Sequence, residues 1–170
     1  MQLLTKMFLL SMLALTTSCV AEEEDDPDLV TEEDMAADEE LEGMLGDGKE
    51  DSALSYVAVA QLVKTAGVPC TGERIATAVA VAKAESGFRP QITNTIGNAR
   101  GIDRGLFQIN SYWHPEVSVA CAFSASCNTR AAVRISKVAT RWTEWWTWKN
   151  GKHIQFMTSA RAAQRSVCGQ

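Results

Sequence analysis

The pattern of hydrophobic and polar positions divides this 170-residue chain into an apolar start, a long acidic stretch and a mixed segment beginning near Ala53. In the mixed segment, apolar residues recur at the three-to-four-residue spacing of amphipathic helices. This spacing predicts helices over 53–67, 71–86, 129–142 and 156–167. The stretch 92–110 is instead rich in Asn, Gly and Thr, which indicates a small, irregular β-hairpin or β-sheet. The expected fold class is therefore α+β, a mostly helical domain over 53–170 with one small irregular β-sheet.

The first residues form a short apolar leader. The apolar run from Met7 to Leu15 is too short to span a bilayer and is typical of a signal peptide, which we assign to residues 1–18. Export permits disulfide bonds. The following "LTTSC" resembles a bacterial lipobox and predicts lipidation of Cys19, which would make the protein a membrane lipoprotein of the cell envelope, facing the periplasm. Cleavage after Ala21 is the alternative, and it would give a secreted protein.

A dense acidic stretch follows the leader. Sixteen acids lie between Glu22 and Asp51, against the single base Lys49. Such dense like charge predicts disorder, so residues 19–52 are interpreted as the anchor cysteine and an acidic disordered linker. The rest of the mature chain has fourteen bases and five acids, a net charge of +9, although the whole chain carries −5. A basic domain suits a polyanionic partner, and we expect it to be a monomer.

Four of the five cysteines lie in the basic segment. Four cysteines permit three disulfide pairings, and the sequence alone does not decide among them. Cys121 and Cys127 are close enough to close one loop, and Cys70–Cys168 would then join the start of the second helix to the C-terminus. This pairing is the preferred one.

Glu85 is a lone acid at the end of the apolar helix predicted over 71–86. That helix starts at Thr71, a favourable N-cap, and its buried stripe runs from Ile75 through Ala82 to Glu85. Burial and the negative end of the helix dipole both raise the pKa of a carboxyl group in this position, which suits a general acid. A glutamate that turns outward to water is the alternative.

Asp103 lies eighteen residues further along, within the predicted sheet. Cleavage of a glycosidic bond requires two carboxyl groups in different environments, one protonated and one ionised. A buried Glu85 and an Asp103 in a polar sheet would supply that pair. The alternative for Asp103 is a turn residue that bonds its own backbone.

The aromatic residues, and the absence of several known motifs, further restrict the reactions that this sequence could support. Aromatic faces stack on sugar rings, and Trp113, in the polar stretch "INSYWHPE", is the tryptophan expected to face a substrate; the alternative is core packing. The two histidines lack the spacing of a metal site. The sequence also has no phosphate loop, nucleophile elbow or nucleic-acid-binding module. We therefore expect no metal, no cofactor and no nucleic-acid partner.

Three motifs in order resemble the lysozyme superfamily, which includes lysozymes and the lytic transglycosylases with SLT-like domains. "AESGF" resembles the helix end with the catalytic Glu, "IDRGLFQINSYW" the sheet motif with an Asp, and "WWTWKN" the Trp-x-x-Trp segment whose first Trp packs on that Glu. The resemblance implies a lysozyme-like catalytic domain over 53–170. Its implied catalytic residues are Glu85 and Asp103, and its implied substrate-binding residues are Ser86, Gln108, Asn110, Trp113 and Trp145.

The resemblance implies cleavage of peptidoglycan glycan strands at the β-1,4 bond between N-acetylmuramic acid and N-acetylglucosamine. Two departures bear on the product. Animal-type lysozymes have more than the four cysteines of this domain, and transglycosylases use no catalytic Asp, since the 6-hydroxyl of the sugar itself attacks. Asp103 thus favours hydrolysis, whereas the bacterial character of the sequence favours transglycosylation. The alternative from another class is a non-catalytic glycan-binding or inhibitory module that has kept the fold.

Overall fold

The computed structural model describes residues 52–95 and 100–169, and the structural statements below concern these residues. The predicted signal peptide over 1–18, the lipid anchor at Cys19 and almost all of the acidic linker lie outside them. The described elements are α2 (Tyr56–Thr65), α3 (Arg74–Ser86), β1 (Thr93–Asn94), β2 (Asp103–Arg104), β3 (Ile109–Asn110), α4 (Val119–Phe123), α5 (Ala125–Ile135), α6 (Trp146–Lys149), the 3-10 helix η1 (Lys152–Phe156) and α7 (Met157–Cys168). None of the described helices is both long enough and apolar enough to cross a membrane.

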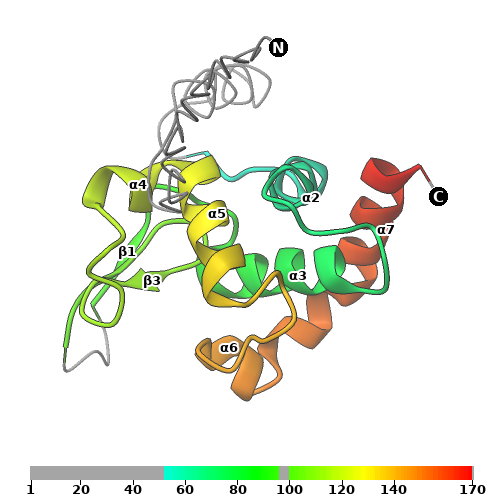
Figure 1. Cartoon of the computed structure of the whole chain (residues 1–170). Helices are drawn as coiled ribbons and strands as arrows, with labels where there is room; N and C mark the ends of the chain where they lie inside the picture. The colour runs from blue at the N-terminus through cyan, green and yellow to red at the C-terminus, as the bar shows by residue number, and fades with distance from the viewer. Residues whose placement is uncertain (1–51, 96–99, 170) are drawn as a thin grey trace, which may run out of the picture. The chain divides into compact units, whose positions relative to one another are not determined.

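Helix α3 is the central element of the domain, and α2, α6, α7 and η1 all pack against it (Figure 1). Its alanine-rich sequence favours a helix and permits close approach of its neighbours. The residues from Ile75 to Ala82 are buried except for Thr77. The helix ends at Gly87, whose left-handed conformation lets its N–H bond to the carbonyl of Lys83. This ending places Glu85 in the last turn of α3, where it contacts α6.

The start of α3 differs from the prediction, because Thr71 is not its N-cap. The helix begins at Arg74, and Glu73 occupies the N-cap position without a side-chain cap. Gln164 of α7 takes over this role, accepting a hydrogen bond from the Ala76 N–H at 2.8 Å and donating one to the Gly72 carbonyl at 2.7 Å. A side chain 88 residues away thus satisfies the helix start, which local propensity could not reveal.

Helix α2 is capped at its start and is joined to α7 at its end. Ser55 caps α2, accepting a hydrogen bond from the Ala58 N–H at 3.0 Å. At the other end, the Lys64 ammonium donates to the carbonyl of Val167 at 2.7 Å. The Cys70–Cys168 disulfide, with Cα atoms 5.8 Å apart, joins the segment before α3 to the end of α7. This is the pairing preferred from the sequence.

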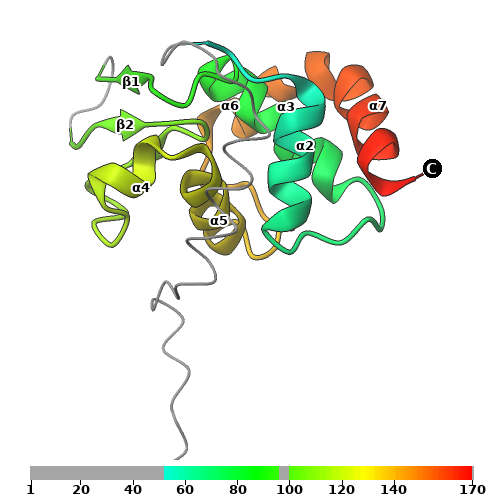
Figure 2. The same ribbon diagram turned by 90° about the horizontal axis from the view of Figure 1, so that it is seen from above.

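The β-strands confirm the predicted α+β class. They form a three-stranded antiparallel sheet in the order β1-β2-β3, and each strand contains two residues. Asp103 lies opposite Asn94 on one side and opposite Asn110 on the other. Figure 2 shows β1 and β2 side by side at the end of the domain that also contains α4. The sheet therefore presents Asp103 from its middle strand.

The loop after β2 lies directly against α4 and α5. Gly105 has φ +77°, and a Cβ atom at this position would be only 1.8 Å from the carbonyl oxygen of Ala122. Asn128 of α5, which is fully buried, fastens the same loop. Its amide oxygen accepts from the Phe107 N–H at 2.8 Å, while its amide nitrogen donates to the carbonyls of Ala122 at 3.0 Å and Arg104 at 3.3 Å.

Helix α5 starts and ends earlier than the predicted range 129–142. It begins at Ala125, where Ser124 accepts a hydrogen bond from the Cys127 N–H at 3.3 Å. It ends at Ile135, because residues 137–139 all have positive φ and cannot continue a right-handed helix. The short α4 was not predicted. Ser124 ends α4 and caps α5, and the Cys121–Cys127 disulfide joins the two helices across it, again as preferred from the sequence.

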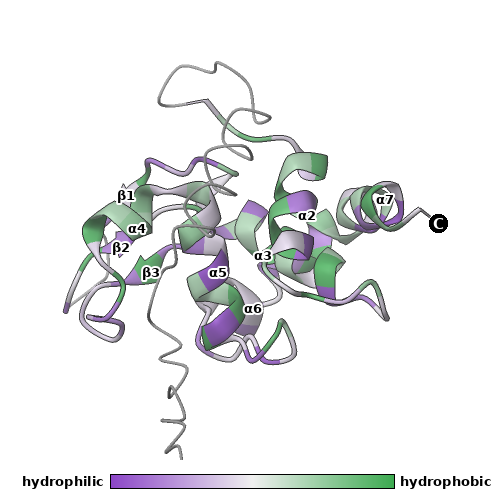
Figure 3. Ribbon diagram, turned by 45° about the horizontal axis from the view of Figure 1, so that its top comes forward, coloured by the Kyte–Doolittle hydropathy of each residue, from purple (hydrophilic) through white to green (hydrophobic). Residues whose placement is uncertain are grey.

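The core lies between the helices and the loop that follows β2. Helices α5 and α7 each carry polar and apolar segments, so their apolar sides can contribute to it (Figure 3). The largest fully buried side chains are Trp142, Phe88, Phe107, Leu62, Ile75 and Leu106. Phe107 stacks on Trp142 with ring centroids 5.8 Å apart. The sheet loop is thereby packed into the same core as the helices.

Candidate active site

A pocket of about 210 Å³ lies where the sheet faces the segment that leads into α6. Three parts of the chain line it: the end of α3, the sheet with the loop after β3, and the start of α6. The lining residues are Glu85, Asp103, Gln108, Ile109, Asn110, Trp113, His114, Glu144, Trp145 and Trp146. The pocket thus brings Glu85 and Asp103 to one cavity, together with four more of the residues selected from the sequence.

Glu85 is half-buried in the last turn of α3. The hydroxyl of Thr147 donates a hydrogen bond to its Oε1 at 2.5 Å. Burial raises the pKa of Glu85, and the negative charge of Asp103 raises it further, whereas the hydrogen bonds from Thr147 and the positive charge of Lys152 lower it. The pKa lies above its usual value because desolvation of the carboxylate is the largest effect.

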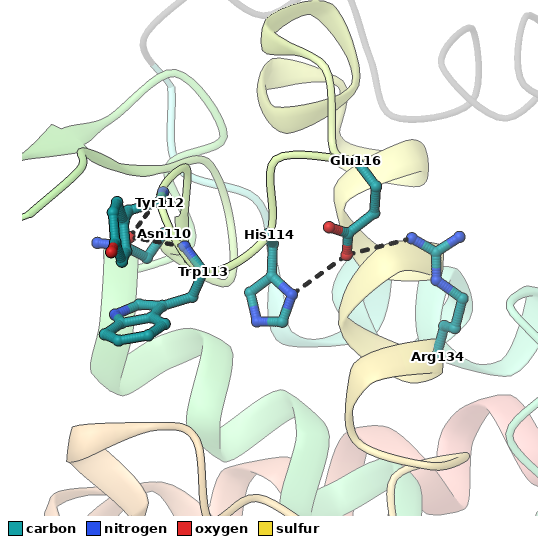
Figure 4. A network of polar contacts seen from close by, with 6 residues as sticks. All are labelled: Asn110, Tyr112, Trp113, His114, Glu116 and Arg134. Carbon is teal, nitrogen blue, oxygen red and sulfur yellow. Dashed lines mark hydrogen bonds and ion pairs between the residues drawn. The ribbon is translucent and has the colours of Figure 1, made fainter.

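Asp103 is partly buried in the middle strand of the sheet. Its cross-strand partner Asn110 donates a hydrogen bond from Nδ2 to Asp103 Oδ1 at 2.7 Å. The Oδ1 of Asn110 accepts from the backbone N–H groups of Tyr112 at 2.9 Å and Trp113 at 3.4 Å (Figure 4). Asn110 therefore orients the Asp103 carboxylate and also fixes the loop that carries Trp113.

Gln108 lines the pocket from a left-handed backbone position. Its φ is +50°, and the residue is 8% exposed. Its Nε2 donates to the carbonyls of Gly105 at 2.8 Å and Ile92 at 3.1 Å, which ties β1 to the loop after β2. The amide nitrogen of Gln108 is thus engaged in holding the sheet together.

Two highly exposed tryptophans line the pocket from different elements. Trp113 of the loop after β3 is 66% exposed, and Trp146 at the start of α6 is 69% exposed. Trp145 is instead buried, and its indole Nε1 donates to the Phe107 carbonyl at 2.8 Å. Trp113 and Trp146 therefore offer aromatic faces to a ligand, while Trp145 joins the α6 segment to the sheet loop.

Comparison with protein families identifies the kind of domain that contains this pocket. A family model described as a lysozyme-like domain matches residues 60–147, just over half of the chain. The chain belongs to the lysozyme-like domain family. Comparisons with curated proteins and with solved structures give no significant match. The matched span contains every lining residue of the pocket, from Glu85 to Trp146.

Ser86 lies outside the pocket of the lysozyme-like domain. Ser86 was expected to bind substrate, but it is only 2% exposed and is not among the residues that line the pocket. Its hydroxyl donates to the Ala82 carbonyl at 3.1 Å and accepts from the Phe88 N–H at 3.1 Å. Ser86 therefore stabilises the end of α3, and with it the position of Glu85.

The sequence interpretation missed several pocket residues. Trp146 could have been found from the double tryptophan, because consecutive residues point in different directions and one of the pair should be exposed. Thr147, which lies outside the pocket lining but donates a hydrogen bond to Glu85, carried no local signal either, because Glu85 lies 62 residues away. His114 and Glu144 also line the pocket, although the sequence interpretation gave neither a role there.

His114 is held by a chain of charged side chains outside the pocket of the lysozyme-like domain. Its Nδ1 lies 3.2 Å from Glu116 Oε1, which lies 3.8 Å from the Arg134 guanidinium of α5. Figure 4 shows the His114 and Trp113 rings projecting from the same side of the loop. In the described part of the chain, no group of three His, Cys, Asp or Glu side chains could hold a metal ion.

Proposed function

We propose that this lysozyme-like domain cleaves the glycan strands of peptidoglycan at the β-1,4 bond between N-acetylmuramic acid and N-acetylglucosamine. The observation that carries the proposal is the pairing of two different carboxyl groups in one pocket. Burial favours the protonated form of Glu85, while Asp103 accepts a hydrogen bond from Asn110 in a polar sheet. These are the two environments that acid-assisted glycoside cleavage requires.

In this proposal Glu85 is the general acid and protonates the oxygen of the leaving sugar. Asp103 stabilises the positive charge that develops on the sugar ring, or attacks it, from the sheet side of the pocket. Trp113 and Trp146 supply faces on which sugar rings stack, and both are more than 60% exposed. The net charge of +9 in the segment after residue 52 suits the anionic cell wall.

Asp103 favours hydrolysis over transglycosylation. A transglycosylase needs only the acid Glu, because the 6-hydroxyl of the sugar forms the new bond and leaves an anhydro end. In this domain a second carboxylate is built into the sheet, and its charge acts on Glu85. We therefore propose that water completes the reaction and that the products have reducing ends.

Mass spectrometry of digested peptidoglycan tests the proposal. The full chain should release muropeptides with reducing ends, and Glu85→Gln should release none, because an amide cannot donate the proton. Asp103→Asn should reduce the rate strongly for a hydrolase and only mildly for a transglycosylase. Glu73→Gln is the matched control, since Glu73 is an exposed acid outside the pocket that pairs with Arg161, and it should keep full activity.

Each outcome separates the alternatives. Anhydro products would replace hydrolysis by transglycosylation, and near-native turnover by Glu85→Gln would refute the assignment of the acid. Binding to sacculi without any product from the wild-type protein would indicate a glycan-binding or inhibitory module instead.

We also propose that Cys19 carries a lipid that anchors the domain in the cell envelope, with the acidic segment as a spacer. The support is the lipobox-like "LTTSC" and the apolar leader before it. Metabolic labelling with a fatty acid in a bacterial host should mark the wild-type chain and not Cys19→Ser. Equal labelling of both chains would contradict the anchor, and an unlabelled wild-type chain in the medium would indicate secretion.

A further inference from the structure

The Glu85 carboxyl has a specific partner that does not itself line the pocket. Thr147, in the first turn of α6, is 7% exposed and is absent from the pocket lining. Its hydroxyl donates to Glu85 Oε1 at 2.5 Å, at the short end of the range for O–H···O hydrogen bonds. A buried hydroxyl outside the pocket lining therefore contacts the proposed acid.

The backbone of Thr147 is itself held in place by a residue of η1. His153 of η1, 8% exposed, lies with Nδ1 3.3 Å from the Thr147 carbonyl oxygen. Because a carbonyl only accepts hydrogen bonds, the proton must be on Nδ1. The His153 ring stacks on Trp148, with centroids 4.2 Å apart and planes inclined by 23°. His153 thus holds the backbone that carries the hydroxyl, and Trp148 holds the His153 ring.

We propose that Thr147 is a positioning residue that selects which oxygen of Glu85 delivers the proton. This inference rests on the proposed function of Glu85 as the acid. With Oε1 engaged as the acceptor of the Thr147 hydroxyl, the acidic proton resides on Oε2. The hydrogen bond also fixes the side-chain torsions of Glu85, so that Oε2 keeps one orientation toward the leaving oxygen.

The same bond assists the proton transfer itself. A hydroxyl donates more strongly to a carboxylate than to a neutral carboxylic acid. As the O–H bond of Glu85 breaks and the leaving oxygen gains the proton, negative charge grows on the carboxyl group, and the Thr147 bond strengthens. The charged groups that act on Glu85 are Asp103 from β2 and Lys152 from η1, and His114 and Glu144 share its pocket.

Three variants test this role in the full chain. Thr147→Val keeps the shape of the side chain and removes the hydroxyl donor, Thr147→Ser keeps the hydroxyl donor, and Thr143→Val is an exposed control in the same segment. Thr147→Val should lower kcat for glycan cleavage roughly tenfold or more, with KM nearly unchanged. The alkaline limb of its kcat–pH profile should move to higher pH, because a group that stabilises the carboxylate is gone. Thr147→Ser should restore both, and Thr143→Val should match the wild type.

The outcomes separate this proposal from the proposed function. If Thr147→Val matches the wild type, or if Val and Ser are equally impaired with no movement of the limb, the positioning role is refuted while Glu85 remains the acid. If the wild type releases no products, the proposed function fails, and NMR then tests the hydrogen bond alone. The Glu85 carboxyl ¹³C signal, assigned by its loss in Glu85→Gln, should titrate at higher pH in Thr147→Val than in the wild type or Thr147→Ser. Identical titrations would overturn the proposal.

Discussion

Asn128 offers the most direct test of how the helices hold the sheet side of the pocket. Its amide makes three hydrogen bonds, to the Phe107 N–H and to the carbonyls of Ala122 and Arg104. Asn128→Leu replaces the amide by an apolar group of similar size, so all three backbone groups lose this partner. Asn128→Asp keeps the acceptor for Phe107 but turns a carboxylate oxygen toward two carbonyls.

The expected loss of stability follows from these three hydrogen bonds. Three hydrogen bonds at about 1 kcal/mol each give about 3 kcal/mol, and each buried group left unpaired raises the cost, so Asn128→Leu should lose about 3–5 kcal/mol. Domains of this size are stable by roughly 5–15 kcal/mol. The variant should therefore fold at low temperature with a markedly lower Tm. Asn128→Asp should be at least as unstable at neutral pH, because a buried charge faces carbonyl oxygens.

Activity should fall further than global stability explains. Arg104 follows Asp103 in β2, and Phe107 precedes Gln108, so loss of Asn128 loosens both flanks of the sheet side of the pocket. We expect a larger fall in kcat than in a control of similar burial. Thr129→Val is that control: Thr129 is fully buried in the same helix, and its hydroxyl donates a hydrogen bond to the Ala125 carbonyl at 2.7 Å.

Urea unfolding followed by circular dichroism measures the free energies, and muropeptide release at a temperature where each variant is folded measures activity. Thr129→Val should lose about 1 kcal/mol and keep its activity. An Asn128→Leu variant within 1 kcal/mol of the wild type, with full activity, would show that the sheet loop does not depend on this side chain.

Two further predictions concern stability. The pKa of Glu85 is raised on folding, so the folded state binds this proton more tightly, and stability falls as pH rises from about 4 through the raised value. Glu85→Gln should therefore raise Tm at neutral pH and not below about pH 4; equal shifts at both pH values would contradict the burial argument. Loop entropy over the sequence separations of 98 and 6 predicts a cost of about 4.7 kcal/mol for removing Cys70–Cys168 and about 2.2 kcal/mol for Cys121–Cys127 by paired Ser substitutions. Equal losses in urea unfolding would refute the entropic account.

Much of the fold could be predicted because it depends on local pattern. The apolar periodicity identified α2, α3 and α7, and the run of Asn, Gly and Thr identified the sheet. The boundaries failed where a distant contact or a backbone conformation, and not the apolar pattern, decides them. Gln164 satisfies the start of α3 from α7, and three residues with positive φ end α5 before the apolar pattern does. Neither effect leaves a trace in the local sequence.

In the candidate site, too, the residues marked by local sequence could be predicted and those placed by packing could not. Glu85 and Asp103 were selected from the sequence because each is an unusual residue in its local setting, and both line the pocket. Ser86 was misassigned because adjacency to Glu85 in the sequence places it on another face of the helix, where it is buried. Thr147 was missed because its partner is determined only by the packing of α6 against the end of α3.

The two disulfides also imply an order of events while the protein is being made. Cys127 follows Cys121 after only six positions, so their thiols can pair as soon as that short piece of chain enters an oxidising compartment. Cys70 must wait for 98 further residues before Cys168 exists. Until then α7 cannot pack against α2 and α3, and the parts of these helices that α7 covers remain exposed. The interval before the second bond forms is therefore when the nascent chain is most exposed to proteases and to aggregation.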